Sequence, residues 1–138
     1  MAELRSLQKN DEAALKELLQ QLTNNEIKLD IHSCLNENNL SCIIIEDNGQ
    51  VIGFGSIAFF LVPTKGYIGT IQDIVVDKLY RGKGFGRKIM NSLIDIAKNK
   101  GINIVELTSN PKRFEARTLY ESLGFTLRET GVFRLIIK

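Results

Sequence analysis

The fold of this chain is decided by the stretch Ile74-Val75-Val76-Asp77-Lys78-Leu79-Tyr80-Arg81-Gly82-Lys83-Gly84-Phe85-Gly86-Arg87-Lys88. A run of β-branched residues leads into a turn with glycine at three alternate positions, 82, 84 and 86. Glycine lets the backbone adopt a positive φ and approach a ligand closely. The first amides of a helix that starts there have no intrahelical acceptor, so they point outwards together. The stretch therefore predicts a strand, an anion-binding turn and a helix in succession.

Positive charge is concentrated around the same turn. Five cations fall within eleven residues, namely Lys78, Arg81, Lys83, Arg87 and Lys88. The dipole of the following helix adds favourable potential for an anion, and the cations can meet phosphate oxygens. A diphosphate is the expected occupant, although a tight turn with solvated cations is the alternative. The spacing matches neither the Walker nor the dinucleotide-binding motif, which argues against nucleotide hydrolysis and hydride transfer.

Before this stretch, the periodicity predicts two helices and then a β-meander. Asn10 or Asp11 is expected to cap a helix with leucines at 15, 18, 19 and 22 on one face, and a second helix is expected from Glu26 to about Asn36. Three antiparallel strands follow, at Ser41–Glu46, Val51–Val62 and Tyr67–Val76. The Asn48-Gly49 pair between the first two of these strands is a strong hairpin signal.

After the turn, a helix is expected to run to about Lys100, and a short strand to span Asn103–Leu107. The pair Asn110-Pro111 is expected to open a last helix that Gly124 closes, and 126–137 is expected to form a terminal strand. The order is then β-α-α-β-β-β-α-β-α-β. It predicts a single α/β domain over residues 1–138, with a mixed sheet and helices on both faces.

Composition narrows the classes of function. The formal net charge is +2, which gives no general reason to expect nucleic acid as a partner. No apolar run approaches the roughly 20 residues of a membrane-spanning helix, so we expect a soluble protein without a membrane partner. The two cysteines lack metal-site spacing and His32 is the only histidine, so we expect free thiols in a reducing cytoplasm and no metal.

The sequence resembles the GNAT superfamily of acetyl-coenzyme A-dependent N-acetyltransferases. The family signature, Arg/Gln-x-x-Gly-x-Gly/Ala after a valine-rich strand, matches Arg81, Gly84 and Gly86. The order of elements matches as well, and so does Ala116-x-x-Leu119-Tyr120-x-x-x-Gly124-Phe125 in the last helix. The resemblance covers the chain from its first predicted helix onward.

The resemblance implies acetyl-CoA as co-substrate and a set of residues that hold it. An amide within Ile74–Val76 would polarise the thioester carbonyl, and the backbone of the turn would take the pyrophosphate. Asn110 either holds the pantetheine arm or caps a helix, and the capping role is favoured. The expected cofactor-binding residues are Ile74, Val75, Val76, Arg81, Gly82, Lys83, Gly84, Phe85, Gly86, Arg87 and Asn110.

Two residues are candidates for proton transfer. Tyr120 stands where the family commonly has the general acid that protonates the departing thiolate, and the alternative is an ordinary core tyrosine. Relatives often have Glu-Asp where this chain has Gln72-Asp73. Gln72 cannot act as a base, so Asp73 is the candidate, provided that a bulge turns it toward the site. Glu106 is a weaker alternative, and an acceptor that arrives neutral needs no strong base.

The predicted function is transfer of an acetyl group from acetyl-CoA to a primary amine of a small molecule, by direct attack in a ternary complex. The alternatives are a coenzyme A-binding module with little turnover, suggested by Gln72 and Arg113 in place of expected functional residues, and acetylation of a protein amine. The resemblance places the acceptor pocket near the first two helices, where Glu26, Asp30 and Glu37 either attract a cationic amine or form a solvated face. A homodimer through terminal strands is left open.

Overall fold

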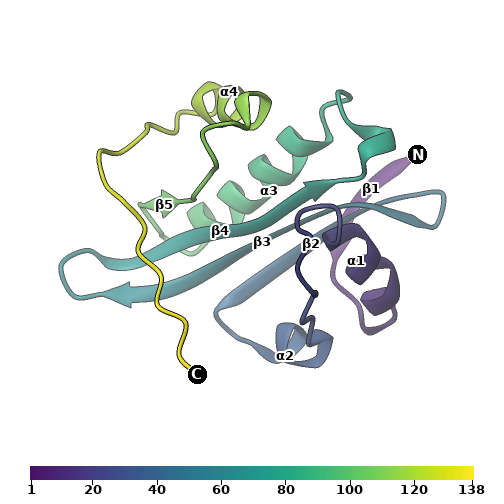
Figure 1. Cartoon of the computed structure of the whole chain (residues 1–138), viewed down its shortest axis with the longest axis horizontal. Coiled ribbons are helices and arrows are strands. Elements are labelled where there is room, and N and C mark those ends of the chain that lie inside the picture. The colour runs from purple at the N-terminus through teal and green to yellow at the C-terminus, as the bar shows by residue number, and fades with distance from the viewer. The chain divides into compact units, whose positions relative to one another are not determined.

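A sheet with strand order β1-β2-β3-β4-β5 runs through the first part of the chain (Figure 1). Strands β1 (Ala2–Ser6), β2 (Leu40–Asp47), β3 (Gln50–Val62) and β4 (Gly66–Val76) are antiparallel neighbours, and β5 (Val105–Glu106) pairs parallel to β4. The computed structural model describes all of residues 1–138 and divides them into two compact units, Met1–Thr108 and Ser109–Lys138. The mixed sheet, the three-strand meander and the strand-helix-strand crossover predicted from the sequence are confirmed.

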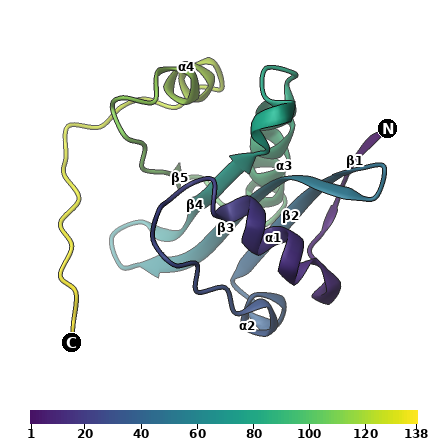
Figure 2. The ribbon, with the colours of Figure 1, turned by 45° about the vertical axis from the view of Figure 1, so that its right-hand side comes forward.

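Helix α1 (Glu12–Leu19) covers one face of this sheet. Its leucines at 15, 18 and 19 form a buried cluster with Ile44, Phe54 and Val75 from three strands and with Ile31 of helix α2 (Ile31–Asn36). Burying each of these side chains stabilises the fold by about 1.5–3 kcal/mol relative to leaving it exposed to water. Figure 2 shows α1 and α2 lying on the same side of the sheet.

Helix α3 (Phe85–Asn99) packs on the opposite face of the sheet. Successive strand residues point to opposite faces, so neighbouring residues of one strand contact different helices. Phe54 faces α1, whereas its neighbours Gly53 and Gly55 lie under Ile89 and Leu93 of α3. The buried residues Ile89, Met90, Leu93 and Ala97 recur at helical spacing along α3. Helices therefore cover both faces of the sheet in the first unit, as predicted.

The start of α1 differs from the predicted cap. Asp11 precedes the helix, but its side chain makes no cap hydrogen bond. Its carboxylate instead accepts two hydrogen bonds from the Arg5 guanidinium, both 2.8 Å, and one from the Gln8 amide at 2.8 Å. Asp11 is only 4% exposed, and the Arg5 hydrogen bonds lower the pKa of its carboxyl. The residue therefore ties strand β1 to the helix start rather than capping the helix.

The second predicted helix is shorter than expected. Helix α2 begins at Ile31 and not at Glu26, because the Asp30 carboxylate accepts the Ser33 amide at 3.0 Å and so caps the helix there. The preceding residues form a loop in which the Gln20 amide group donates to the carbonyls of Thr23 and Asn25. Competing side-chain bonds of this kind are not visible in an apolar periodicity.

The second unit contains helix α4 (Phe114–Ser122), which starts later than predicted. The Asn110 side chain accepts the Lys112 amide at 2.9 Å and shapes a turn before the helix, whose N-cap residue is Arg113. Gly124 follows the helix with φ 97°, as expected of a closing glycine. Residues 126–137 form no strand, which corrects the prediction of a terminal strand.

We predict that Gly55→Ala destabilises the protein. An added Cβ would collide with Ile89 Cγ2 and lie 2.8 Å from Ile74 Cδ1, so α3 would have to shift. Overpacking of this kind costs about 1–3 kcal/mol. Urea unfolding followed by circular dichroism measures the change in the free energy of unfolding. Gly131→Ala is the control, because nothing lies within 4 Å of a Cβ there. Equal midpoints for the two variants would contradict the close packing of α3 on β3.

Candidate functional site

The glycine-rich turn begins with a short 3-10 helix, η2 (Lys78–Tyr80). The Asp77 amide donates to the Ile52 carbonyl at 2.8 Å, which holds the end of β4 against β3. The Asp77 carboxylate accepts a hydrogen bond from the Leu79 amide at 2.9 Å. The backbone carbonyl of Asp77 accepts one from the Tyr80 amide at 2.8 Å. Asp77 thus shapes the start of the turn through both its side chain and its backbone.

Two glycines in the left-handed conformation complete the turn. Gly82 has φ 78° and Gly84, the N-cap residue of α3, has φ 85°. A side chain in this region costs roughly 1–2 kcal/mol, which explains why glycine stands at both positions. The Lys88 amide donates to the Gly84 carbonyl at 3.2 Å, so the amides of 85–87 precede the hydrogen-bonded body of the helix. A turn of this geometry at a helix N-terminus is suited to bind an anion.

The cations of the turn lie beside this helix start. Lys83 Nζ is 5.5 Å from the centre of the Tyr80 ring, and Lys88 Nζ is 5.9 Å from that of Phe85. The two rings are 6.5 Å apart. The Arg81 Nε donates to the Val76 carbonyl at 3.0 Å, which bridges the end of β4 and the turn. The turn therefore combines the first amides of α3 with a positively charged rim, formed by Arg81, Lys83 and Lys88.

A β-bulge interrupts β4 at the candidate base. Val75 pairs with Phe54 and Gln72 pairs with Ser56, so Asp73 and Ile74 together oppose the single residue Gly55. Asp73 has φ 54°, a rare conformation for a residue with a side chain. The bulge that the sequence analysis required for Asp73 is present. The Ser56 hydroxyl donates to the Gln72 carbonyl at 2.9 Å and supports the bulge from β3.

Strand β5 accompanies β4 for only two residues. Gly69 pairs with Val105 and Thr70 with Glu106, and the Gly69 amide donates to the Ile104 carbonyl at 2.9 Å. This ladder ends before the bulge, so β5 does not pair with the half of β4 that runs from Ile71 to Val76. The predicted cofactor residues Ile74, Val75 and Val76 all lie in that half.

Two free cysteines lie near Asp73. The free thiols of Cys34 on α2 and Cys42 on β2 lie beside each other. Burial, the neighbouring thiol and the charge of Asp73 raise the pKa of Cys42 to about 12. Burial and the charges of Asp30 and Asp73 also raise the pKa of Cys34. Both side chains are therefore protonated thiols at neutral pH, with little nucleophilic character.

Tyr120 and Asn110 belong to the second unit. Tyr120 is 8% exposed, and its ring centre lies 6.2 Å from that of Phe125 in an edge-on arrangement. Burial raises the pKa of the Tyr120 phenol, while the charge of Arg113 acts in the opposite direction. Tyr120 is thus a protonated phenol over the neutral range. The capping role favoured for Asn110 is wrong, because the N-cap residue of α4 is Arg113 and the Asn110 side chain accepts the Lys112 amide in the turn before the helix.

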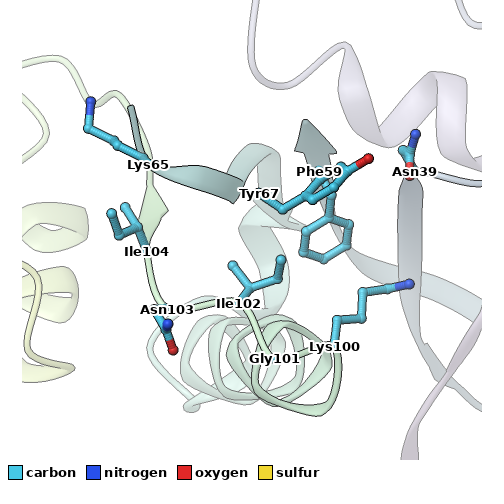
Figure 3. A pocket seen from close by; sticks show the side chains of 9 residues that line it. All are labelled: Asn39, Phe59, Lys65, Tyr67, Lys100, Gly101, Ile102, Asn103 and Ile104. Atoms are coloured by element: carbon cyan, nitrogen blue, oxygen red, sulfur yellow. The ribbon is translucent and has the colours of Figure 1, made fainter. Parts of the chain in front are cut away.

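A separate cavity of about 500 Å³ lies at the other end of α3 and β4 from the glycine-rich turn. Figure 3 shows Lys100 beside Phe59, with Nζ 5.3 Å from the ring centre, while Lys65 extends away from Lys100. The cavity contains none of the predicted site residues. Its lining is Asn39, Phe59, Lys65, Tyr67, Lys100, Gly101, Ile102, Asn103 and Ile104.

The sequence analysis missed one residue at the turn, Gln21. Its side-chain oxygen accepts the Lys78 amide at 3.0 Å, although the two residues are 57 positions apart. No local pattern signals such a contact. The structure contains no group of three or more residues suited to hold a metal ion, and no helix is both long and apolar enough to cross a membrane.

Comparison with known proteins identifies the family. Residues 3–125 match the model of the acetyltransferase (GNAT) family. The chain therefore belongs to this family of acetyl-CoA-dependent acyltransferases, as the resemblance of its motifs implied.

Individual relatives are named N-acetyltransferases. Glucosamine 6-phosphate N-acetyltransferase of Trypanosoma brucei brucei is 35% identical over 86 residues, which are 61% of this chain and 56% of the relative. L-2,4-diaminobutyric acid acetyltransferase of Virgibacillus pantothenticus is 29% identical over 118 residues, which are 84% of this chain and 73% of the relative. The chain thus spans little more than half the length of the first of these.

A solved structure shares the fold. A crystal structure of a predicted acetyltransferase of Clostridium acetobutylicum with acetyl-CoA superposes with a TM-score of 0.81 and 22% identity. The match covers 98% of this chain and 96% of that one.

We predict that Tyr120 titrates above pH 10. Its burial disfavours the phenolate, and Arg113→Ala should raise the pKa further, because the arginine charge stabilises the phenolate. NMR of protein with carbon-13-labelled tyrosine follows the phenol, with assignment from Tyr120→Phe. A midpoint below 10, or a decrease in Arg113→Ala, would contradict the described surroundings of Tyr120.

Proposed function

We propose that this protein is an N-acetyltransferase that moves an acetyl group from acetyl-CoA to a primary amine of a small molecule. The observation that carries the proposal is the turn at Gly82 and Gly84, where two left-handed residues aim the first amides of α3 outward within a cationic rim. The coenzyme A pyrophosphate is the anion that this family would place there. In this proposal, residues 1–138 form one catalytic domain.

The turn and the second half of β4 would hold the donor. Backbone amides from Arg81 to Arg87 would bind the pyrophosphate, with Lys83 and Lys88 available to its oxygens. The pantetheine arm, a chain of amides, would lie along Ile74–Val76, where β5 no longer accompanies β4. Backbone pairing with an extended ligand is an economical mode of recognition, because an unpaired strand edge needs partners. Asn110 is a weaker candidate, since its side chain already accepts the Lys112 amide.

Acetyl transfer would proceed by direct attack. The lone pair of the amine adds to the thioester carbonyl, and the carbonyl oxygen becomes a tetrahedral oxyanion. A backbone amide within Ile74–Val76 would stabilise this oxyanion, since a fixed donor aimed at developing charge lowers the barrier without reorganisation. Collapse of the intermediate expels the coenzyme A thiolate, and the attacking nitrogen loses its extra proton to water to leave the neutral acetylated amine.

Two side chains would carry out the proton transfers, one as general acid and one as general base. Tyr120, a phenol that stays protonated at neutral pH, would donate its proton to the departing thiolate. Asp73, turned out of the regular strand by the bulge, would accept a proton from the incoming ammonium directly or through water. Glu106 stays the weaker alternative for the base. The two main candidates come from different units of the chain.

The acceptor would be a small amine. The relatives described above are named for glucosamine 6-phosphate and for L-2,4-diaminobutyric acid, both compounds with a primary amine. The Asp73 carboxylate raises the pKa of the two thiols, one of which is on α2, so it would bring negative charge to this part of the site. A cationic amine would be attracted to it.

We predict that Gly84→Ala weakens acetyl-CoA binding about tenfold. Alanine at φ 85° is strained, so the helix start should rearrange and its amides should lose their common direction. Isothermal titration calorimetry with acetyl-CoA measures the dissociation constant. Gly49→Ala is the matched control, because it places a similar strain at φ 78° in the β2–β3 hairpin. Equal weakening in both variants would show that lost stability, and not the turn, is responsible.

We predict that Tyr120→Phe lowers kcat at least about 100-fold, the usual minimum contribution of a general acid, with the acetyl-CoA dissociation constant unchanged within about twofold. Thiol release with glucosamine 6-phosphate, L-2,4-diaminobutyrate and a broad panel of primary amines measures turnover, and mass spectrometry identifies the acetylated product. Tyr67→Phe, at the separate cavity, is the control. Unchanged turnover in Tyr120→Phe would remove the general-acid role. Acetyl-CoA binding without acetylation of any amine would favour a coenzyme A-binding module instead.

A further inference from the structure

Four consecutive backbone amides fix the start of the glycine-rich turn. Three of their acceptors are backbone or turn atoms: the carbonyl of Ile52 for Asp77, and the side chain and carbonyl of Asp77 for Leu79 and Tyr80. The amide of Lys78 differs, because it donates to the side-chain oxygen of Gln21 at 3.0 Å. Gln21, two residues after the end of α1, is thus the side chain by which a distant part of the chain holds the turn.

The position of Gln21 is fixed by the packing of α1 and by a backbone hydrogen bond. The helix is anchored by the buried leucines 15, 18 and 19, and the Gln21 amide donates to the Leu18 carbonyl at 3.1 Å. Gln20, the neighbouring residue, serves a different purpose, because its amide group donates to the carbonyls of Thr23 and Asn25. Two adjacent glutamines therefore divide their contacts between the loop that follows α1 and the turn that precedes α3.

The hydrogen bonds of Asp77 and of Arg81 tie the turn to β3 and β4, and Gln21 adds a support from the segment after α1. Residues 81–84 are exposed and include the two left-handed glycines, so apolar packing does not orient them. Rotation of η2 about the end of β4 would change the direction in which the amides of the following residues point. A hydrogen bond at Lys78, the first residue of η2, opposes that rotation.

We propose that Gln21 is a positioning residue for the coenzyme A pyrophosphate. It does not touch the ligand. It holds η2 through the Lys78 amide, and so presents the amides of the turn in the direction that the diphosphate requires. This inference rests on the proposed function, because it concerns the same donor site.

The primary test is the affinity of Gln21→Ala for acetyl-CoA. We expect the dissociation constant and the KM for acetyl-CoA to rise about fivefold, as for the loss of one hydrogen bond, while kcat stays unchanged. Gln20→Ala is the matched control, since it removes the adjacent glutamine of the same helix end without touching the turn. Its acetyl-CoA dissociation constant should stay within twofold of that of the wild type.

A double-mutant cycle isolates the hydrogen bond. Lys78→Pro removes the donor amide and suits the backbone, because Lys78 is the first residue of η2 and Asp77 has the extended ψ of 134° that proline requires before it. Lys78→Ala is the reference for the lost charge. Adding Gln21→Ala should weaken binding about fivefold in the Lys78→Ala background and leave it unchanged in the Lys78→Pro background.

The outcomes separate this inference from the proposed function. If the wild type does not bind acetyl-CoA in calorimetry, the proposed function fails and the role of Gln21 fails with it. If the wild type binds and Gln21→Ala binds equally well, only the positioning role is overturned. Equal losses in Gln20→Ala and Gln21→Ala, or an additive cycle, would likewise overturn it, because the effect would then be a general loosening of α1. Thermal unfolding of each variant confirms that the folded protein is being compared.

Discussion

The close approach of helix α3 to strand β3 is the constraint on which the first unit depends. Gly55 has no side chain, and the space above it is filled by Ile89 and Leu93 of α3 and by Ile74 of β4. Interiors are packed to crystal-like density, so this contact leaves α3 little freedom to slide or rotate. The N-terminus of α3 is therefore held in place relative to the sheet. The apolar packing over Gly55 therefore also fixes the position of the phosphate-binding turn at that end of the helix.

The same contact is linked to the bulge in β4. Because Asp73 and Ile74 together oppose Gly55, the Ile74 side chain can lie over the glycine while Asp73 leaves the regular alternation of the strand. Asp73 holds a φ of 54°, which persists only where the surroundings impose it. Ser56 contributes by donating to the Gln72 carbonyl. One irregularity thus takes Asp73 out of the regular alternation of β4 and shifts the register between β3 and β4 beside the residues proposed to contact the thioester.

The elements of the chain differ in how well their sequence predicts them. The hairpin at Asn48-Gly49 and the start of α3 at Phe85 were predictable, because each depends on glycine chemistry within a few residues. Helix α2 was predicted too long, since the capping bonds of Asp30 compete with an apolar pattern that extends further. The terminal strand expected at 126–137 is absent, because alternation of apolar residues shows a capacity for pairing and does not supply a partner.

By itself, the sequence determined the order of the elements, the glycine-rich turn with its cations, and the motifs that place the chain in its family. These features are local: they depend on dihedral preferences and on charge within short stretches. Only the tertiary structure decided that β4 bulges at Asp73, that two thiols lie together near that carboxylate, and that Gln21 holds the amide of Lys78. These arrangements bring together residues distant in the chain, such as Asp73 with the two thiols and Gln21 with Lys78, so they follow from the packing of whole elements and cannot be predicted from local sequence.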